Sequence, residues 1–300
     1  YRLLTDKQDY LKNVLVIMDP CLNPDGRDRY VNFYNQYGNA PFDPHSFSAE
    51  HNETWPGGRP NHYLFDLNRD WAWMTQIESK QRVAVYNQWL PHVHVDFHEQ
   101  GINEPYYFPP AAEPFHEVIT NWQRDFQKDI GKNHASYFDK EGWLYFSKEI
   151  FDLLYPSYGD TYPTYSGSIG MTYEQGGSGR AGLAVITQVG DTLTLLDRVK
   201  HHVTTGLSTV EMASIHAGKL IKEFKSFHSV KNYKYKTFIL AGEEQRLSSL
   251  LKLLDNNNVE YHKSTENTTV KAYNYLSTKQ EQVKLTGKEY IVSINQSKGT

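Results

Sequence analysis

The sequence lacks several features that mark common classes of protein. Its 300 residues include one cysteine, Cys21, which excludes an intramolecular disulfide and a cysteine-based zinc site. Its apolar runs fall short of the ~20 residues that a membrane-spanning helix needs, so we expect no membrane span. It begins with neither an initiator methionine nor a signal peptide, and the opening YRLLTDKQDYLKN predicts a processed or truncated piece.

Neither sign of charge predominates in the sequence. The 31 Lys and Arg against 35 Asp and Glu give a net charge of -4, without any Lys/Arg-rich run. We therefore expect no nucleic-acid partner. The apolar share of 39% predicts a substantial core, and 22 tyrosines favour the partly wet surfaces that line binding clefts. The length suits one large domain, or one medium domain with a small one attached.

Strand-like and helix-like patterns alternate along the chain, which predicts an α/β fold. Residues 13–18 (NVLVIM) form a short apolar run typical of a buried parallel strand, and residues 27–60 predict a long ordered loop. Apolar residues recur at helical spacing over 73–90, over 115–130 with Gly131 as the stop, and over 193–210, where we expect a long helix that runs through about residue 224.

A polar, basic stretch over residues 225–235 predicts a linker. It separates a domain of residues 1–224 from a small α/β domain of residues 236–300. In the small domain, two strands and an amphipathic helix over residues 237–262 predict the start of a βαβ unit, and a third strand follows at 290–294. This domain is near the lower size limit for independent folding, so we expect it to be incomplete.

Residues 170–182, GMTYEQGGSGRAG, place Glu174 between a strand-like approach and a glycine-rich turn. Strand ends border pockets while the strand itself stays rigid, so Glu174 is a candidate general base. The alternative is a solvated glutamate at the rim of the sheet.

Residues 92–101, HVHVDFHEQG, alternate apolar and polar side chains, which predicts a strand with three imidazoles and Asp96 on one face. His92 and His94 would lie ~6.6 Å apart, close enough to share a metal ion, whereas His94 and His98 would lie ~13 Å apart. His98 is at the strand end, where ligands from other elements can reach it. A purely structural role is the alternative for each histidine.

Residues 57–71 gather side chains suited to an anion. Asp66, Asn68 and Arg69 fall within four residues, and Arg59 precedes them. Two arginines and an amide suit a planar carboxylate, because arginine donates hydrogen bonds in a fixed fork. The alternative is a surface salt-bridge cluster.

Four segments resemble, in order, the motifs of the zinc carboxypeptidase (funnelin) family of metallopeptidases. Residues 23–26 match its NPDG turn, and residues 66–69 (DLNR) resemble the segment that binds the substrate's terminal carboxylate. Residues 96–98 (DFH) resemble the strand end that carries a zinc-binding histidine, and residues 172–180 resemble the segment of the catalytic glutamate. The resemblance covers about residues 13–224 and implies a mixed central sheet flanked by helices.

The resemblance also implies roles for single residues in the chemistry. His98 would bind a zinc ion, and Asp66 would be the partner of a zinc-binding histidine. The zinc would activate a water molecule. Glu174 would be the general base that takes the proton of this water. Arg59 would polarise the scissile carbonyl of the peptide.

The substrate would be a peptide with a free C-terminal carboxylate, which Asn68 and Arg69 would bind. Tyr155 would be the mobile tyrosine that folds over the bound substrate, with Tyr158 and Tyr162 as rivals for that role. The family habit implies a secreted or periplasmic enzyme that removes C-terminal residues from peptides or peptidoglycan-derived peptides.

The chain departs from the family in one respect. The family's first two zinc ligands come from a His-x-x-Glu motif, and none of the thirteen histidines here has Glu three residues later. In the family this motif lies further before the NPDG turn than the 22 residues that precede Asn23. We therefore expect a piece truncated before the motif, which holds zinc poorly and is inactive by itself. Two alternatives stay open: a non-catalytic peptidase-fold module that binds C-terminal carboxylates, and a metal-free hydrolase with paired carboxylates such as Asp96 and Glu174.

Overall fold

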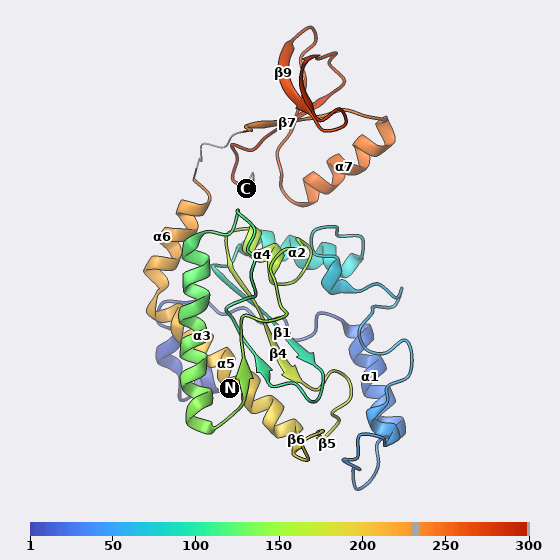
Figure 1. The fold of residues 1–300 in the computed structure, drawn as a ribbon, viewed down its shortest axis with the longest axis vertical. Coiled ribbons are helices and arrows are strands. Elements are labelled where there is room, and N and C mark those ends of the chain that lie inside the picture. The colour runs from blue at the N-terminus through green and yellow to red at the C-terminus, as the bar shows by residue number, and fades with distance from the viewer. Residues whose placement is uncertain (230–234, 299–300) are drawn as a thin grey trace. The chain divides into compact units, whose positions relative to one another are not determined.

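The computed structural model describes residues 1–229 and 235–298. The chain divides into two compact units, one of residues 1–82 and 89–227, the other of residues 83–88 and 228–300. Both units combine helices with strands, which confirms the predicted α/β class (Figure 1). The linker predicted over residues 225–235 falls partly outside the described residues, and its first residues continue a helix to Phe227.

A four-stranded mixed sheet of order β1-β4-β2-β3 forms the centre of the first unit. β1 (Val93–Gln100) and β4 (Ile169–Gly176) pair in parallel along their whole lengths, which confirms the strand predicted at His98 (Figure 1). β2 (Tyr106–Tyr107) is antiparallel to β4 and parallel to β3 (Tyr145–Phe146).

One face of this sheet carries the hydrophobic core. Ile169, Met171 and Tyr173 of β4 are buried there together with Phe126 of α3 (Asn121–Glu141). Because side chains alternate along a strand, Glu174 lies on the opposite face. A short helix, α4 (Thr161–Tyr165), contacts β4 where Gly170 permits close approach, since a Cβ there would lie 2.0 Å from the Asp160 carbonyl oxygen.

The buried side of α5 (Leu195–Ile215) is largely polar. Its Thr209 hydroxyl lies 2.6 Å from the Tyr173 hydroxyl, and Thr205 lies 2.9 Å from the Tyr106 hydroxyl. Buried phenols need hydrogen-bond partners, and the threonines of α5 supply them.

The single long helix predicted through residue 224 is two helices. α5 ends at Ile215, and α6 (Ala217–Phe227) begins after His216. The first unit also contains α1 (Pro24–Tyr37), α2 (Ile77–Trp89, shared between the units), β5 (Ala184–Ile186), β6 (Thr192–Thr194) and short 3-10 turns at Arg2–Leu4, Gln8–Leu11, Ala49–His51 and Leu67–Arg69.

The strand predicted over residues 13–18 is wrong. These residues belong to no strand, and Leu15 and Ile17 are 70% and 55% exposed. An apolar run becomes a buried strand only where a neighbouring strand pairs with it, and among the described residues none pairs with 13–18.

The long loop predicted over residues 27–60 is also wrong at its start, because α1 spans Pro24–Tyr37. Asn23 caps this helix, its side-chain oxygen accepting a hydrogen bond from the Gly26 N–H at 3.0 Å. Pro24 stands in the first turn, where its missing N–H costs nothing. The NPDG segment is therefore the start of a helix and not a separate turn.

The helix stop predicted at Gly131 is wrong, since α3 continues to Glu141 and Gly142 ends it in the left-handed conformation, with φ 71°. Thr120 starts the helix with a capping box. Gly131 lies in the middle because a Cβ there would come 2.2 Å from the Pro109 carbonyl oxygen. The glycine thus allows close packing and does not end the helix.

The second unit holds a sheet of order β7-β11-β8 and a separate hairpin of β9 and β10. β11 lies between β7 and β8 and is antiparallel to both, so these two strands run parallel to each other. With α7 between them in the chain they form a split βαβ unit, which agrees with the predicted strand–helix–strand start of this domain. The hairpin has no strong sequence signal, since most of its side chains are polar and exposed. The bounds are β7 (Thr237–Leu240), α7 (Glu244–Asn256), β8 (His262–Lys263), β9 (Thr269–Asn274), β10 (Lys279–Lys284) and β11 (Tyr290–Ser293).

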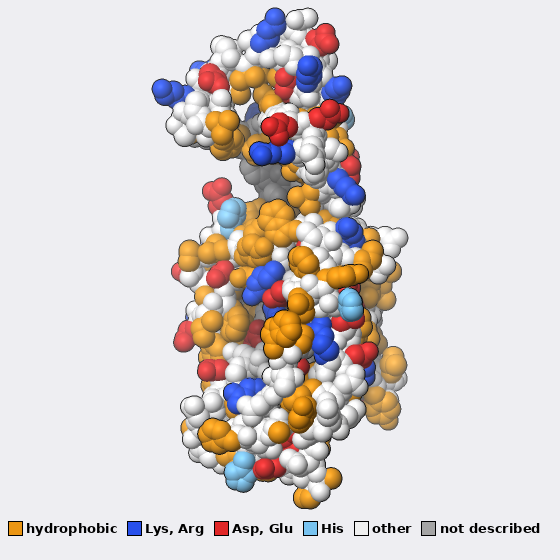
Figure 2. Space-filling view, turned by 90° about the vertical axis from the view of Figure 1, so that its right-hand side faces the viewer, with side chains coloured by type: hydrophobic (Ala, Val, Ile, Leu, Met, Phe, Trp, Pro, Cys, Tyr) orange, Lys and Arg blue, Asp and Glu red, His pale blue; other side chains and the backbone are white. Residues whose placement is uncertain are grey.

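The surface carries charges of both signs. On the face shown in Figure 2, acidic and basic side chains are interspersed, without a broad field of one sign. No helix within the described residues is both long enough and apolar enough to cross a membrane.

Replacing Gly131 by alanine should lower the free energy of unfolding by about 2–3 kcal/mol. The clash with the Pro109 carbonyl outweighs the gain of about 1 kcal/mol in helix propensity. Urea denaturation followed by circular dichroism measures the change, with exposed Lys132→Ala as a control expected within about 0.5 kcal/mol of the parent. An alanine variant as stable as the parent would contradict this packing of α3.

Candidate functional site

The parallel pairing of β1 and β4 places His98 directly beside Glu174. Both residues lie near the carboxyl ends of their strands, and parallel strands bring these ends to one edge of the sheet. Asp96 and Thr172 share the same register and alternate onto the same face. Two segments far apart in the sequence thus form one polar surface.

A short turn sets Asn68 against this surface. Leu67–Arg69 forms one turn of 3-10 helix, and Asp66 caps it by accepting a hydrogen bond from the Asn68 N–H at 2.9 Å. The Asn68 side-chain nitrogen lies 2.9 Å from His98 Nε2. Its oxygen accepts a hydrogen bond from the Gly159 N–H at 2.6 Å, which fixes the orientation of the amide. Asn68 thus joins three separate segments of the site.

The imidazole of His98 is paired with Asp96. Its Nε2 lies 2.7 Å from Asp96 Oδ2, and both side chains are largely buried. Burial lowers the pKa of His98, but the carboxylates of Asp96 and Glu174 outweigh this effect, and the pKa is raised. Burial raises the pKa of Asp96, and the neighbouring His98, His94 and Arg82 outweigh it, so that this pKa is lowered. The pair favours a charged imidazolium, whose Nε2–H donates to the Asp96 carboxylate and therefore does not accept from the nearby Asn68 nitrogen.

Two arginines stand beside this group and face solvent. Arg59 Nε donates a hydrogen bond to Asp66 Oδ2 at 3.1 Å, and Arg69 Nη1 lies 4.0 Å from the same oxygen. The Arg69 guanidinium also lies over the ring of Tyr158, 4.4 Å from its centroid. The side chains of Arg59 and Arg69 are 50% and 47% exposed, so an anion from solvent can reach them.

Of the three tyrosines considered, Tyr155 and Tyr158 border Arg69. The Tyr155 hydroxyl accepts a hydrogen bond from Trp73 Nε1 at 2.8 Å and donates one to the Arg69 carbonyl oxygen at 3.4 Å. Tyr158 lies beneath the Arg69 guanidinium. Tyr162 is buried against Trp71, which removes it as a residue that folds over a ligand.

Glu174 is 9% exposed, which excludes a solvated rim residue. Its Oε2 is buried and accepts no hydrogen bond from the described residues. Burial raises the pKa of Glu174 to about 7, with Asp96 adding to the rise and with His98 and Arg59 opposing it. A carboxyl group with a pKa near 7 exchanges its proton at neutral pH, as a general base must.

His92, which directly precedes β1, and the histidines of β1 do not form a metal site among themselves. His92 packs edge-on against Phe224 at 4.8 Å between ring centroids, and His94 packs against Trp71 at 5.3 Å. Burial lowers the pKa of His94 to about 4, as for a structural imidazole. No three His, Cys, Asp or Glu side chains of the described residues are placed to hold one metal ion. With His98 as a single imidazole, these residues do not fit a zinc ion by themselves.

Two residues that the sequence did not single out also shape the site. A Cβ on Gly159 would lie 2.0 Å from Asp96 Oδ2, so glycine is needed for the approach to Asn68. Arg82 Nη2 donates to the Leu67 carbonyl oxygen at 2.9 Å and supports the Asn68 turn from behind. In the sequence, Gly159 could have been noticed as a glycine within a tyrosine-rich segment. Nothing in the sequence distinguishes Arg82 from any other polar residue of a helix.

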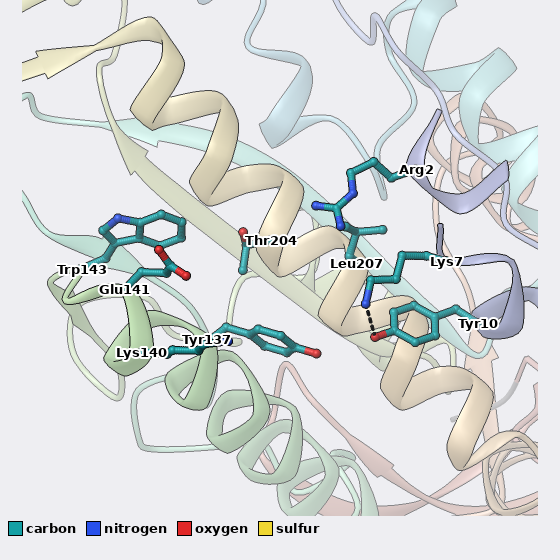
Figure 3. Close-up of a pocket in the computed structure, with 9 residues that line it drawn as sticks. All are labelled: Arg2, Lys7, Tyr10, Tyr137, Lys140, Glu141, Trp143, Thr204 and Leu207. Carbon is teal, nitrogen blue, oxygen red and sulfur yellow. Dashed lines mark hydrogen bonds between the residues drawn. The ribbon is translucent and has the colours of Figure 1, made fainter. Parts of the chain in front are cut away.

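A separate cavity of about 240 Å³ lies among the N-terminal turns, α3 and α5 (Figure 3). Its Tyr10 and Tyr137 hydroxyls both donate hydrogen bonds to Glu211. None of the residues gathered around His98 and Glu174 lines this cavity, so it is not part of the candidate site.

Comparison with known proteins leaves the family open. No protein-family model, no curated protein and no solved structure matches the chain. The functional argument therefore rests on the geometry of the site.

Replacing Glu174 by glutamine should change how stability depends on pH. Folding raises the pKa of Glu174 from 4.5 to about 7, so its favourable contribution is complete below about pH 4.5 and is lost as the pH rises through 7. Glutamine stays uncharged, so Glu174→Gln should gain about 2–3 kcal/mol relative to the parent between about pH 5 and pH 8.

Urea denaturation at a series of pH values measures this gain. Glu149→Gln, at an exposed position, controls for the loss of one carboxylate. A difference between Glu174→Gln and the parent that stays constant with pH would contradict the raised pKa.

Proposed function

We propose that the protein is a metallocarboxypeptidase-like hydrolase that acts on peptides with a free C-terminal carboxylate, peptidoglycan-derived peptides included. The observation that carries the proposal is the group of Arg59, Asn68 and Arg69 around Asp66, in which Asn68 lies against His98, the β1 neighbour of Glu174. A carboxylate-binding group thus adjoins a buried carboxyl group of near-neutral pKa. The motif resemblance supports the same conclusion, and a secreted or periplasmic location is proposed on that resemblance.

The recognition step follows from charge and exposure. Arg59 and Arg69 share Asp66, which compensates their two positive charges only in part and leaves the pair attractive to an anion. Arginine binds a carboxylate through two parallel hydrogen bonds, which also fix its orientation. Tyr155, beside Arg69, would close over the bound end of the peptide. Recognition of the terminal carboxylate would restrict the enzyme to the last residue of the chain.

The chemical step would use Glu174 and Arg59. The Glu174 carboxylate would take a proton from the attacking water and pass it to the leaving amine. Arg59 would stabilise the negative charge that develops on the carbonyl oxygen. The charge of Arg59 already lowers the pKa of Glu174, which shows that the two groups lie within electrostatic reach of each other.

Zinc remains part of the proposal through the resemblance alone. His98 would be one ligand, and the others would have to come from outside the described residues, so we derive no step through the ion. We expect these residues by themselves to bind peptides without cleaving them.

A non-catalytic module that binds C-terminal carboxylates is the second candidate. The observation that favours it is the hydrogen bond of His98 to Asp96, which occupies the ring nitrogen facing the site. A metal-free hydrolase with paired Asp96 and Glu174 is less well supported, because the lowered pKa of Asp96 keeps it charged and unable to donate a proton.

Recognition of the carboxylate can be tested by isothermal titration with N-benzoyl-glycyl-phenylalanine and its C-terminal amide. The chain should bind the acid at least about tenfold more tightly than the amide. Arg69→Met should weaken binding of the acid about 10- to 100-fold, the usual effect of losing a hydrogen bond to a charged group, and should leave the amide unaffected. Arg27→Met, an exposed arginine paired with Asp28, is the matched control. Equal affinity for the acid and the amide would contradict the proposed recognition of the carboxylate.

Elemental analysis and a cleavage assay on the complete product of the natural gene separate the two candidates. The hydrolase predicts one zinc per chain and cleavage of the blocked dipeptide, and Glu174→Gln should abolish cleavage while keeping the zinc. Binding of the dipeptide without zinc and without cleavage would instead support the module.

A further inference from the structure

The loop that carries Arg59 is attached to the start of α1 through its main-chain carbonyl groups. Asn23 Nδ2 donates hydrogen bonds to the carbonyl oxygens of Gly58 and Arg59, at 3.3 and 3.0 Å. The oxygen of the same amide caps α1 by accepting from the Gly26 N–H. One side chain therefore starts the helix and ties the loop to it.

Arg29 completes this attachment six residues further along the chain, within the same helix. Its guanidinium donates to the carbonyl oxygens of Gly57, Pro60 and Asn61, the last two at 2.5 and 2.7 Å. With the two bonds from Asn23, each of the five consecutive carbonyls of residues 57–61 accepts from a side chain at the start of α1. A planar guanidinium can do this because it carries five N–H donors in a fixed arrangement.

The spacing in the sequence explains why both side chains reach the same loop. Asn23, Gly26 and Arg29 follow one another at intervals of three residues, so they lie on one face of the helix start. Gly26 lets the loop come close, since a Cβ there would lie 2.0 Å from the Gly58 carbonyl oxygen. Beyond the loop, Asp25 Oδ2 accepts a hydrogen bond from the His62 N–H at 2.9 Å.

The consequence concerns the direction of the Arg59 side chain. With all five carbonyls bound to α1, the peptide planes of residues 57–61 cannot rotate. The Arg59 side chain therefore starts from a fixed Cα, and its Nε reaches Asp66 Oδ2 at 3.1 Å. An unattached loop with two glycines would let this long side chain take many other directions, at an entropic cost on binding.

We propose that Arg29 is a positioning residue, which fixes the 57–61 loop so that Arg59 faces Asp66 and an anion bound beside Arg69. The ligand in this proposal rests on the proposed function, whereas the geometry of the loop does not. The two parts can therefore be tested separately.

The geometry is tested by NMR of the arginine Nε–Hε groups in the whole chain. In Arg29→Met, the Arg59 signal, assigned with Arg59→Lys, should lose the slow hydrogen exchange that its bond to Asp66 gives. The signal of buried Arg198, which is paired with Glu99, should stay unchanged and report an intact fold. Arg27→Met, on the same helix, should leave both signals as they are. An unchanged Arg59 signal in Arg29→Met would overturn the proposal.

The functional part is tested by affinity for N-benzoyl-glycyl-phenylalanine in a double-mutant cycle. Arg29→Met and Arg59→Met should each weaken binding about tenfold, and the double variant should be no weaker than either, because Arg29 acts through Arg59. Arg29→Lys should restore part of the affinity and of the Arg59 signal. Additive losses would contradict the role of Arg29. If Arg29→Met does not fold, Arg29→Gln takes its place, since glutamine lacks both the charge and the fork of arginine.

The two proposals fail in different ways. If the parent chain does not bind the dipeptide, the proposed function fails, and the NMR result still decides whether Arg29 positions Arg59. If the dipeptide binds but Arg29→Met leaves both the affinity and the Arg59 signal unchanged, the positioning role fails alone.

Discussion

The structure depends most on the parallel pairing of β1 with β4. The register of this pair puts His98 beside Glu174, and the period of two then separates an apolar face from a polar one. The apolar face is buried under α3 and α5, which keeps the two strands rigid and lets the other face carry ionisable groups. A shift of one residue in the register would turn Glu174 into the core and His98 out of reach of Asn68. Site and core are therefore fixed by the same set of main-chain hydrogen bonds.

The polar side of the sheet is stabilised by mutual partners. Burying His98 and Asp96 is unfavourable for each alone, and their contact at 2.7 Å offsets the cost. Asn68 then links the pair to Gly159 and, through the cap of Asp66, to the arginines. Glu174 differs from these residues, because its Oε2 is buried without a hydrogen-bond donor among the described residues. An unsatisfied buried carboxyl is costly to a fold, and such costs are typical of groups kept for binding or chemistry.

The sequence alone predicted the structure correctly where a local pattern of residues determines it. The alternation over residues 92–100 predicted β1, and the gathering of Arg59, Asp66, Asn68 and Arg69 in one place could be expected from their spacing. The predictions from sequence were wrong where a contact between distant segments determines the structure. Gly131 is a residue type that commonly ends helices, and yet it lies inside α3 because Pro109 packs against it. Residues 13–18 have the composition of a buried strand and lack a partner strand. The buried face of α5 could not be found from apolar spacing, because the groups beneath it are phenols that need hydroxyl partners.

The central claim is that the group around Asn68 and Arg69 binds a C-terminal carboxylate. The most direct measurement is an NMR titration of the whole chain with N-benzoyl-glycyl-phenylalanine, following the side-chain N–H signals of asparagine and arginine. The account predicts saturable shifts for Asn68, Arg69 and Arg59, and no shift for Arg2, which lines the separate cavity of Figure 3. Shifts confined to Arg2, or the same shifts with the dipeptide amide, would contradict it.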